Sequence, residues 1–330
     1  MEPNKQLSIV IPTYNRADFL DYSLETHIPM VEKYNIQIFV SDNASTDNIS
    51  EIMKKWMAKY QHLHYSRNET NIGPDANFEK ALKMPDTEYV WLLGDTYRIQ
   101  DGVIGYILGL IENDKFDHIL INVGNEIKDF ETQIYNNQNK LLEEMFWLMT
   151  CLSVHIYSNS IINNANFSRY RNSNFIQTGI IFEYLDNRSF KISWTKEYSV
   201  ERILSVNGIT KDLWINKYFE IWVNNRINTI MSLPPSYKIK SKLKAIQYDD
   251  ERKKIGTKLV LGLRAKGILN FIDVKLNKDL LILSSSFFIY YFSIMVSLIP
   301  ESIVIVIRKL YKIMKHLKTK LSSAGKYAKK

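Results

Sequence analysis

The sequence predicts an α/β fold in which helices flank a mostly parallel sheet. Over the first 125 residues, apolar runs rich in Ile and Val alternate with segments of helical spacing. Strands that alternate with helices of this length imply right-handed crossovers between parallel strands. Polar residues follow several of the predicted strands, at the ends where such sheets bind ligands. With 330 residues and 45% hydrophobic content, the chain is long enough for one large or two modest domains.

Five strands and four helices are predicted within residues 7–123. The strands are short apolar runs between polar turns, and they cover 7–12, 36–42, 62–67, 88–95 and 117–123. The helices carry apolar residues every three or four positions, as Leu20, Leu24, Ile28 and Val31 do. They cover 18–34, 48–60, 75–84 and 102–113.

The remainder of the chain is less regular. A helix is expected over 140–158, and the apolar stretch 175–185 is typical of either a buried helix or a buried strand. The character of the sequence changes near residue 241. We therefore predict three parts, 1–125, 126–240 and 241–330, of which the first two are halves of one domain.

The C-terminal part has the pattern of membrane-associating helices. Residues 280–299 carry no charge, and after Pro300 the apolar side chains of Ile303, Ile307 and Leu310 share one helical face, with Lys and Arg mainly on the other. A membrane span needs about 20 apolar residues, so 280–299 is long enough. Its five serines, and the outward location that a single span would give the N-terminal domain, favour buried or interfacial helices instead.

The charge is concentrated at the C-terminus. Residues 302–330 carry nine Lys or Arg and no Asp or Glu, so the total of +8 leaves −1 for residues 1–301. A nearly neutral body argues against nucleic-acid binding, and the basic tail predicts contact with an anionic membrane surface. The single Cys151 indicates a reducing compartment, and residues 1–15 lack a signal-peptide pattern. The expected location is cytoplasmic, peripheral on the inner face of the cell membrane.

Four segments within residues 7–99 carry a family resemblance. They read LSIVIPTYNR, IQIFVSDNASTDNISEI, NETNIGPDANFEKAL and EYVWLLGDTYRI, in this order. The set resembles the signature segments of glycosyltransferase family 2, whose members have the GT-A fold. The resemblance is close over the first third of the chain and extends over the rest only in general organisation. It implies a Rossmann-like mixed sheet and a nucleotide-sugar donor.

The resemblance also implies a pocket for the donor. Pro12, Thr13 and Tyr14 offer a rigid turn, a hydroxyl and a ring to a uracil or thymine base, and Arg16 offers charge-assisted bonds to the diphosphate. Asp42 is similar to the family carboxylate that holds the base. Taken alone, each segment also fits an ordinary turn or helix cap. The predicted donor-binding residues are Pro12, Thr13, Tyr14, Asn15, Arg16, Asp42, Asn71, Gly73 (which lets backbone approach the ligand) and Asn77.

The segment after the fourth strand departs from the family pattern. Family members carry two or three acids there, which bind a divalent metal, whereas this chain reads Gly94-Asp95-Thr96-Tyr97. One carboxylate together with diphosphate oxygens is enough for some Mg²⁺ sites. Asp95 is therefore the predicted catalytic and metal residue for Mg²⁺ or Mn²⁺. The alternatives are reliance on Arg16 and Arg98, or loss of catalysis.

An inverting transferase also needs a general base that deprotonates the acceptor hydroxyl. The family places an acid about a hundred residues beyond the metal motif, where Glu183 and Asp186 are the candidates in this chain. Glu183 follows an apolar run, and partial burial of a carboxyl group raises its pKa. Either residue equally fits a solvated acid at the end of an element.

These observations predict an inverting glycosyltransferase that uses a UDP- or dTDP-sugar. The basic tail suggests a lipid-linked saccharide acceptor, as in the assembly of O-antigen, capsule or protein glycan. One alternative is a GT-A-fold protein without catalysis that binds nucleotide sugars or acts as a scaffold, and the missing acids favour it. Another is a membrane-surface protein whose tail is its function.

Overall fold

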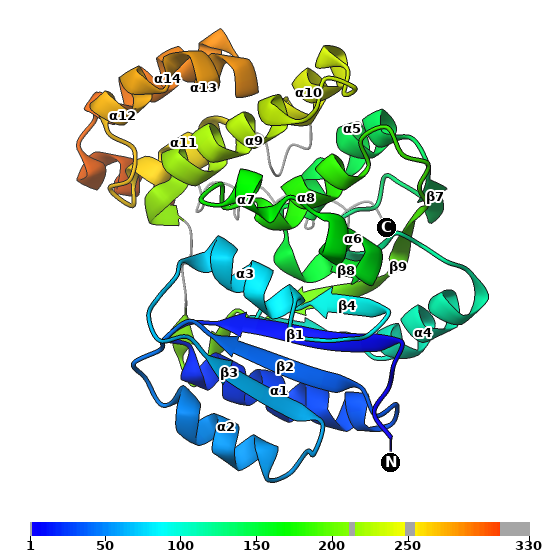
Figure 1. Ribbon diagram of the computed structural model, residues 1–330. Coiled ribbons are helices and arrows are strands. Elements are labelled where there is room, and N and C mark those ends of the chain that lie inside the picture. The colour runs from blue at the N-terminus through cyan, green and yellow to red at the C-terminus, as the bar shows by residue number, and fades with distance from the viewer. Residues whose placement is uncertain (1, 211–214, 248–254, 311–330) are drawn as a thin grey trace, which may run out of the picture. The chain divides into compact units, whose positions relative to one another are not determined.

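The computed structural model describes residues 2–210, 215–247 and 255–310 (Figure 1). Contacts divide the chain into two compact units. The first comprises Met1–Lys211 and Asn228–Ala245, and the second comprises Asp212–Ile227 and Ile246–Lys330. Every strand of the described residues belongs to the first unit.

Nine strands of the first unit form one sheet in the order β3-β2-β1-β4-β8-β6-β9-β5, with β7 paired to β9. The pairs β1–β2, β2–β3, β1–β4 and β6–β9 are parallel, and β5, β7 and β8 join in antiparallel fashion. Six strands therefore run in one direction, which confirms the predicted mixed, mostly parallel sheet. The strands are β1 Leu7–Thr13, β2 Gln37–Asp42, β3 Leu63–Arg67, β4 Tyr89–Leu92, β5 Tyr97–Ile99, β6 His118–Val123, β7 Gln133–Tyr135, β8 His155–Ser158 and β9 Ile192–Arg202, with a separate hairpin of β10 Ser205–Val206 and β11 Ile209–Thr210.

The elements predicted over residues 7–123 are confirmed. The helices there are α1 Ala17–Glu32, α2 Ile49–Met57, α3 Pro74–Leu82 and α4 Val103–Asn113. Helix α3 packs against β1, β2 and β4, while α1 packs against α2 and β5. In Figure 1, α3 lies on one side of the strands β1–β3 and α2 on the other. This layering leaves the carboxyl ends of β1, β2 and β4 together at one edge of the sheet.

The helix predicted over 140–158 is wrong beyond residue 149. Helix α5 (Gln138–Met149) is followed by a short 3-10 turn, η1 (Leu152–Val154), and then by β8. The strand forms because His155–Ser158 fills the gap between β4 and β6, where all four residues are buried. The stretch 175–185 is the buried helix α8 (Ile176–Tyr184). The other helices of the first unit are α6 Asn159–Asn164, α7 Phe167–Tyr170 and α10 Ile239–Ile246, and α9 Arg226–Ser232 begins in the second unit.

The predicted parts 1–125 and 126–240 share this one sheet. Strand β8 lies between β4 and β6, and β9 lies between β6 and β5. Buried tryptophans join the later residues to the earlier ones, since the indole N–H of Trp91 in β4 donates to the carbonyl oxygen of Ser153 at 2.9 Å. Most of the two parts therefore builds one domain around a common core, whereas residues 212–227 of the predicted second part belong to the second unit.

The described residues of the second unit are helical. They form η2 Ile215–Lys217, η3 Phe219–Asn225, α11 Thr257–Arg264, α12 Phe271–Leu276, α13 Lys278–Ser284, α14 Phe287–Leu298 and a last helix, Glu301–Leu310. The uncharged stretch 280–299 is divided between α13 and α14. None of the described helices is by itself long and apolar enough to cross a membrane, but α14 and Glu301–Leu310, bent by 115°, meet that requirement as a pair. Residues 311–330 of the predicted tail lie outside the described residues.

Candidate active site

Asp95 lies three residues beyond the carboxyl end of β4 and contacts the end of β1. The Thr13 hydroxyl donates to its Oδ2 at 2.8 Å, and Nη1 of Arg16 donates to its Oδ1 at 2.7 Å. The side chain of Asp95 is 1% exposed, whereas that of Arg16 is 22% exposed. The three residues meet because β1 and β4 are adjacent parallel strands. Three of the predicted site residues are therefore brought together at the carboxyl edge of the sheet.

The loop after β1 is locked to the loop after β2. The Oδ1 of Asn15 accepts from the Thr46 amide at 2.7 Å, and the Asn15 amide donates to the Ser45 hydroxyl at 2.9 Å. The amide of Ala17 donates to Oδ2 of Asp47 at 2.9 Å, so the cap of α1 comes from the second loop rather than from Asn15. Asn15 adopts the left-handed conformation, with φ of 50°. These contacts fix the direction in which Arg16 leaves β1.

Asp42, the predicted base-binding carboxylate, is fully buried at the end of β2. Its Oδ1 accepts from the Ser45 amide at 2.9 Å, and its Oδ2 accepts from the Tyr65 hydroxyl at 2.7 Å. Burial raises the pKa of Tyr65 to about 12, and its hydrogen bond to Asp42 adds to the shift. Asp42 thus supports the loop that holds Asn15. Its contact with a base stays a prediction.

Asn77 is also buried and satisfied by the protein. Its Oδ1 accepts from the Ser41 hydroxyl at 2.8 Å and from Nδ2 of Asn68 at 3.1 Å. Its Nδ2 donates to the Ser41 carbonyl at 3.0 Å. With 2% exposure, the side chain ties α3 to the end of β2 and does not open toward a cleft.

Asn71 holds the turn that contains Gly73. Its Oδ1 accepts from Nδ2 of Asn43 at 2.8 Å and from the Gly73 amide at 2.9 Å. Gly73 has a φ of +83°, which residues other than glycine rarely adopt, and open space lies where a Cβ would stand. The turn therefore presents bare backbone to the surface, and its approach to a ligand stays a prediction.

Within the loop at 12–16, Tyr14 is exposed and Arg16 is partly exposed. The Tyr14 ring is 42% exposed, while Pro12 and Thr13 are buried within β1. An exposed ring offers stacking to a nucleotide, and a partly exposed guanidinium group offers it charge-assisted hydrogen bonds. This pair is the part of the loop that a ligand reaches without rearrangement.

The residues around Asp95 do not fit the predicted Mg²⁺ or Mn²⁺ site. Both carboxylate oxygens already have donors, and one of them is the cationic Arg16. At the position of a second family acid, the Tyr97 hydroxyl interacts with the Cys151 thiol and the Arg202 guanidinium group. Across the described ranges, no three His, Cys, Asp or Glu side chains lie close enough to hold an ion. Arg16 is paired with Asp95, and Arg202 forms an ion pair with Glu126 at 3.9 Å, so cations and their partners stand where the family places a cluster of acids.

Arg202, rather than Arg98, is the second cation beside this motif. Tyr97 in β5 is directly opposite Arg202 in β9. Successive side chains of a strand point to opposite faces, so Arg98 faces away from Tyr97, and its charge acts on His27 of α1. Sequence reasoning missed Arg202 because it did not predict strand β9.

Glu183 and Asp186, the predicted general bases, have structural partners. Oε2 of Glu183 accepts from the Tyr170 hydroxyl at 2.8 Å and forms an ion pair with Arg169 at 3.0 Å. Oδ1 of Asp186 accepts from the Ser236 hydroxyl. Both carboxylates thus join α8 to neighbouring segments of the first unit.

Helix α8 also directs Glu183 away from Asp95. The hydroxyl of Tyr184, the next residue, donates to Asp117, which lies just before the amino end of β6. Asp95 lies beyond the carboxyl end of β4, and β4 and β6 run in the same direction. The structure therefore does not bring Glu183 and Asp186 to Asp95.

Asp75 is an acid at the carboxyl edge of the sheet that sequence reasoning missed. It lies in the first turn of α3, two residues after Gly73, and is 4% exposed. Its Oδ2 accepts from the Asn174 amide at 3.0 Å, which joins α3 to the loop before α8, and its Oδ1 has no partner. Burial raises the pKa of Asp75 to about 6, although hydrogen bonds from the backbone amides of Asn174, Ser173 and Asn172 act to lower it. The available signal was an acid directly after Gly-Pro at a helix start.

Comparison with known proteins identifies the family. The family model of glycosyl transferase family 2 matches residues 8–198. The chain belongs to glycosyl transferase family 2. The abequosyltransferase RfbV of Salmonella typhimurium is 29% identical over 165 residues, which cover 45% of this chain and 48% of that protein. The chain thus spans about half of the length of this relative.

Two further proteins extend the comparison. The GalNAc(5)-diNAcBac-PP-undecaprenol beta-1,3-glucosyltransferase of Campylobacter jejuni is 23% identical over 224 residues, which cover 64% of this chain and 70% of that protein. The crystal structure of S. aureus TarS 1-349 in complex with UDP-GlcNAc superposes with a TM-score of 0.51 at 15% identity, over 92% of both chains. At this identity the likeness concerns the fold, and it confirms the predicted GT-A architecture.

Proposed function

We propose that the chain is an inverting glycosyltransferase that moves a sugar from a UDP- or dTDP-sugar to a lipid-linked saccharide. Family membership supports the reaction class. The names of both relatives describe sugar transfer, and one of them includes an undecaprenol-linked diphosphate. The observation that carries the proposal is the cluster of Thr13, Arg16 and Asp95 at the carboxyl edge of β1 and β4.

Arg16 and Arg202 bind the donor diphosphate in this account. A guanidinium group has five N–H donors, and Asp95 accepts from Nη1 of Arg16, which leaves other donors for phosphate oxygens. When the acceptor oxygen bonds to the anomeric carbon, the bond from that carbon to the diphosphate oxygen breaks and its electron pair stays on the nucleotide. Cations fixed beside that oxygen stabilise the developing charge.

Asp75 is the general base in this account. It lies at the amino end of α3, directly after the turn of Asn71–Gly73, at the same edge of the sheet as Asp95. Its unpartnered Oδ1 is an acceptor for the hydroxyl proton, and a pKa of about 6 suits proton transfer near neutral pH. The acceptor must displace part of the loop around Asn174 to reach it, because the oxygen is buried.

Nucleotide release from candidate donors tests the proposed activity. The full chain is incubated with UDP- and dTDP-sugars and a bacterial lipid extract, in Mg²⁺ and in EDTA, and free UDP or dTDP is measured. We expect release with one donor class that changes little in EDTA, since the arginines replace the metal. Asp75→Asn should lower kcat at least about 100-fold with an unchanged donor KM, the scale of general-base catalysis.

The non-catalytic alternative predicts a different result. Its supporting observation is the replacement of family acids by Thr96 and Tyr97. Under that alternative the nucleotide binds, but no donor is turned over with any lipid extract, and Asp75→Asn does not change the release of UDP or dTDP. Release that is abolished by EDTA and restored by Mn²⁺ would contradict the arginine-based account while keeping the transferase.

A further inference from the structure

Helix α14 is apolar on its exposed side, unlike a surface helix of a water-soluble protein. Its exposed side chains are all large and apolar or aromatic, with Phe288 and Leu298 each 66% exposed. Its buried side carries Ser293 and Ser297, which are at most 5% exposed. The exposed set is Phe287, Phe288, Tyr291, Met295 and Leu298.

Helical geometry places these residues on one stripe. At 3.6 residues per turn the five exposed side chains fall within about 100° of arc, opposite the two serines. The hydroxyls of Ser293 and Ser297 donate to the carbonyls of Ile289 and Ile294, both at 2.7 Å, so they need no water. Helix α14 therefore satisfies its polar groups inward and presents hydrocarbon outward, which is stable against an apolar medium.

Two further helices of the second unit also expose apolar side chains. Helix α12, which packs against α14, exposes Ile272 at 67% and Leu276 at 78%. The helix Glu301–Leu310 buries Val304 and exposes nearly all of its other apolar residues. We name the whole set the apolar surface of the second unit; it consists of Ile272, Leu276, Phe287, Phe288, Tyr291, Met295, Leu298, Ile303, Ile305, Val306, Ile307 and Leu310.

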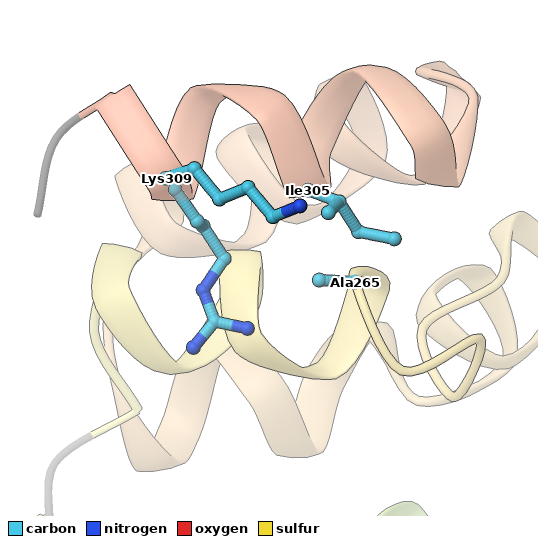
Figure 2. Close-up of a pocket in the computed structure, with 4 residues that line it drawn as sticks. Ala265, Ile305 and Lys309 are labelled. Atoms are coloured by element: carbon cyan, nitrogen blue, oxygen red, sulfur yellow. The ribbon is translucent and has the colours of Figure 1, made fainter.

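Positive charge accompanies this surface. The described residues 255–310 contain seven Lys or Arg and three Asp or Glu, a net of +4. A hollow of about 200 Å³ lies among Ala265, Ile305, Arg308 and Lys309, as Figure 2 shows. Neither cation of this hollow forms an ion pair with an acid of the described residues. Two cations at the border of exposed hydrocarbon form a site for a phosphate group.

We propose that the apolar surface of the second unit inserts into one leaflet of an anionic phospholipid bilayer. Helix α14 and Glu301–Leu310 then lie in the interface, and Arg308 and Lys309 bind phospholipid phosphates. The bend of 115° between these helices suits shallow insertion. The net positive charge that attracts an anionic bilayer also opposes the pairing of this surface with a second copy of the chain. The proposal goes beyond the transfer reaction and does not depend on it.

Vesicle co-sedimentation of the full chain tests the proposal. The vesicles contain phosphatidylcholine alone or with phosphatidylglycerol. We expect binding that is tighter with phosphatidylglycerol and weaker in high salt. Leu298→Glu should reduce the partition coefficient at least about tenfold, because it removes an exposed leucine that the bilayer would bury and adds a charge. Leu204→Glu is the matched control, since Leu204 is an exposed leucine of the first unit at 77% exposure, and it should bind as wild type does.

The cationic hollow has its own variant. Arg308→Gln with Lys309→Gln should remove most of the preference for phosphatidylglycerol and retain the weaker binding to phosphatidylcholine. Wild-type protein that stays in the supernatant with both vesicles would overturn the proposal, as would equal losses in Leu298→Glu and Leu204→Glu. A dimer in sedimentation velocity that Leu298→Glu dissociates, without vesicle binding, would assign the surface to a second copy instead. UDP binding, measured in parallel, reports on the active site alone.

Discussion

The ion pair between Arg16 and Asp95 supports the fold as well as the site, and a double-mutant cycle separates the two roles. In Arg16→Ala the carboxylate of Asp95, only 1% exposed, keeps a single donor, the Thr13 hydroxyl. Breaking a buried pair from one side costs about 3–5 kcal/mol. Because Arg16 is 22% exposed, water replaces part of its contribution, and we expect a loss of about 2 kcal/mol.

The stability changes expected for the other two variants of the cycle follow from the same contacts. Asp95→Asn keeps an acceptor for the Thr13 hydroxyl and leaves Arg16 partly hydrated, so its cost should be about 1 kcal/mol. The double variant should lose less than the sum, with a coupling energy of about 1 kcal/mol or more. Urea unfolding followed by tryptophan fluorescence measures all four proteins.

A surface pair supplies the control. Lys54 and Glu51 form an ion pair with both side chains about 70% exposed, so Lys54→Ala should change stability by less than about 0.5 kcal/mol. The reasoning is refuted if Arg16→Ala has the same urea midpoint as the wild type. It is also refuted if the stability loss of the double variant equals the sum of the losses of the two single variants.

Three further predictions concern buried groups of the first unit. Gly179→Ala should lower the melting temperature despite its better helix propensity, because a Cβ would stand 2.3 Å from the Tyr170 ring; overpacking of this kind costs about 1–3 kcal/mol, and an unchanged melting temperature would contradict it. Burial lowers the pKa of His27 and of His155 to about 4. The unfolded chain binds protons below its pKa of about 6.5, so stability is full above that pH and falls toward about pH 4, by about 3 kcal/mol for each histidine; a urea midpoint independent of pH over this range would refute the assignment. Burial raises the pKa of Asp75 to about 6, so the contribution of Asp75 to the free energy of unfolding is favourable at low pH and is lost as the pH rises through 6. Asp75→Asn should therefore stabilise the protein by about 2 kcal/mol near pH 8 and by little near pH 4, and equal effects at both pH values would contradict this.

Local patterns predicted the half of the sheet that carries the four family motifs. The apolar runs of β1, β2 and β4 are bounded by polar turns, so their carboxyl ends were predictable from spacing alone. Because parallel neighbours bring these ends together, the meeting of Thr13, Arg16 and Asp95 also followed from the motif order. The structure adds the interlocking of two loops through Asn15, which depends on hydrogen bonds between segments about 30 residues apart.

Other parts of the site depend on long-range partners that no local pattern reveals. The sequence around Asn77 does not show whether its side chain faces a ligand or other protein groups. Its partners Ser41 and Asn68 come from separate segments of the chain. Arg202 reaches the motif through antiparallel pairing of β9 with β5. His155 begins a strand within a stretch whose composition also suits a helix, and only the gap between β4 and β6 decides between them.

Calorimetric titration of the full chain with UDP and dTDP, in EDTA and then in Mg²⁺, tests the central claim most directly. The account predicts that one of these nucleotides binds in EDTA, with affinity changed less than about threefold by Mg²⁺. Arg16→Gln should weaken that binding at least about tenfold, since hydrogen bonds to charged groups contribute about 1.5–3 kcal/mol. Arg188→Gln, on an exposed arginine that contacts Tyr184, should not change it. Absence of binding to both nucleotides, or equal binding by the two arginine variants, would contradict the assignment of the donor site.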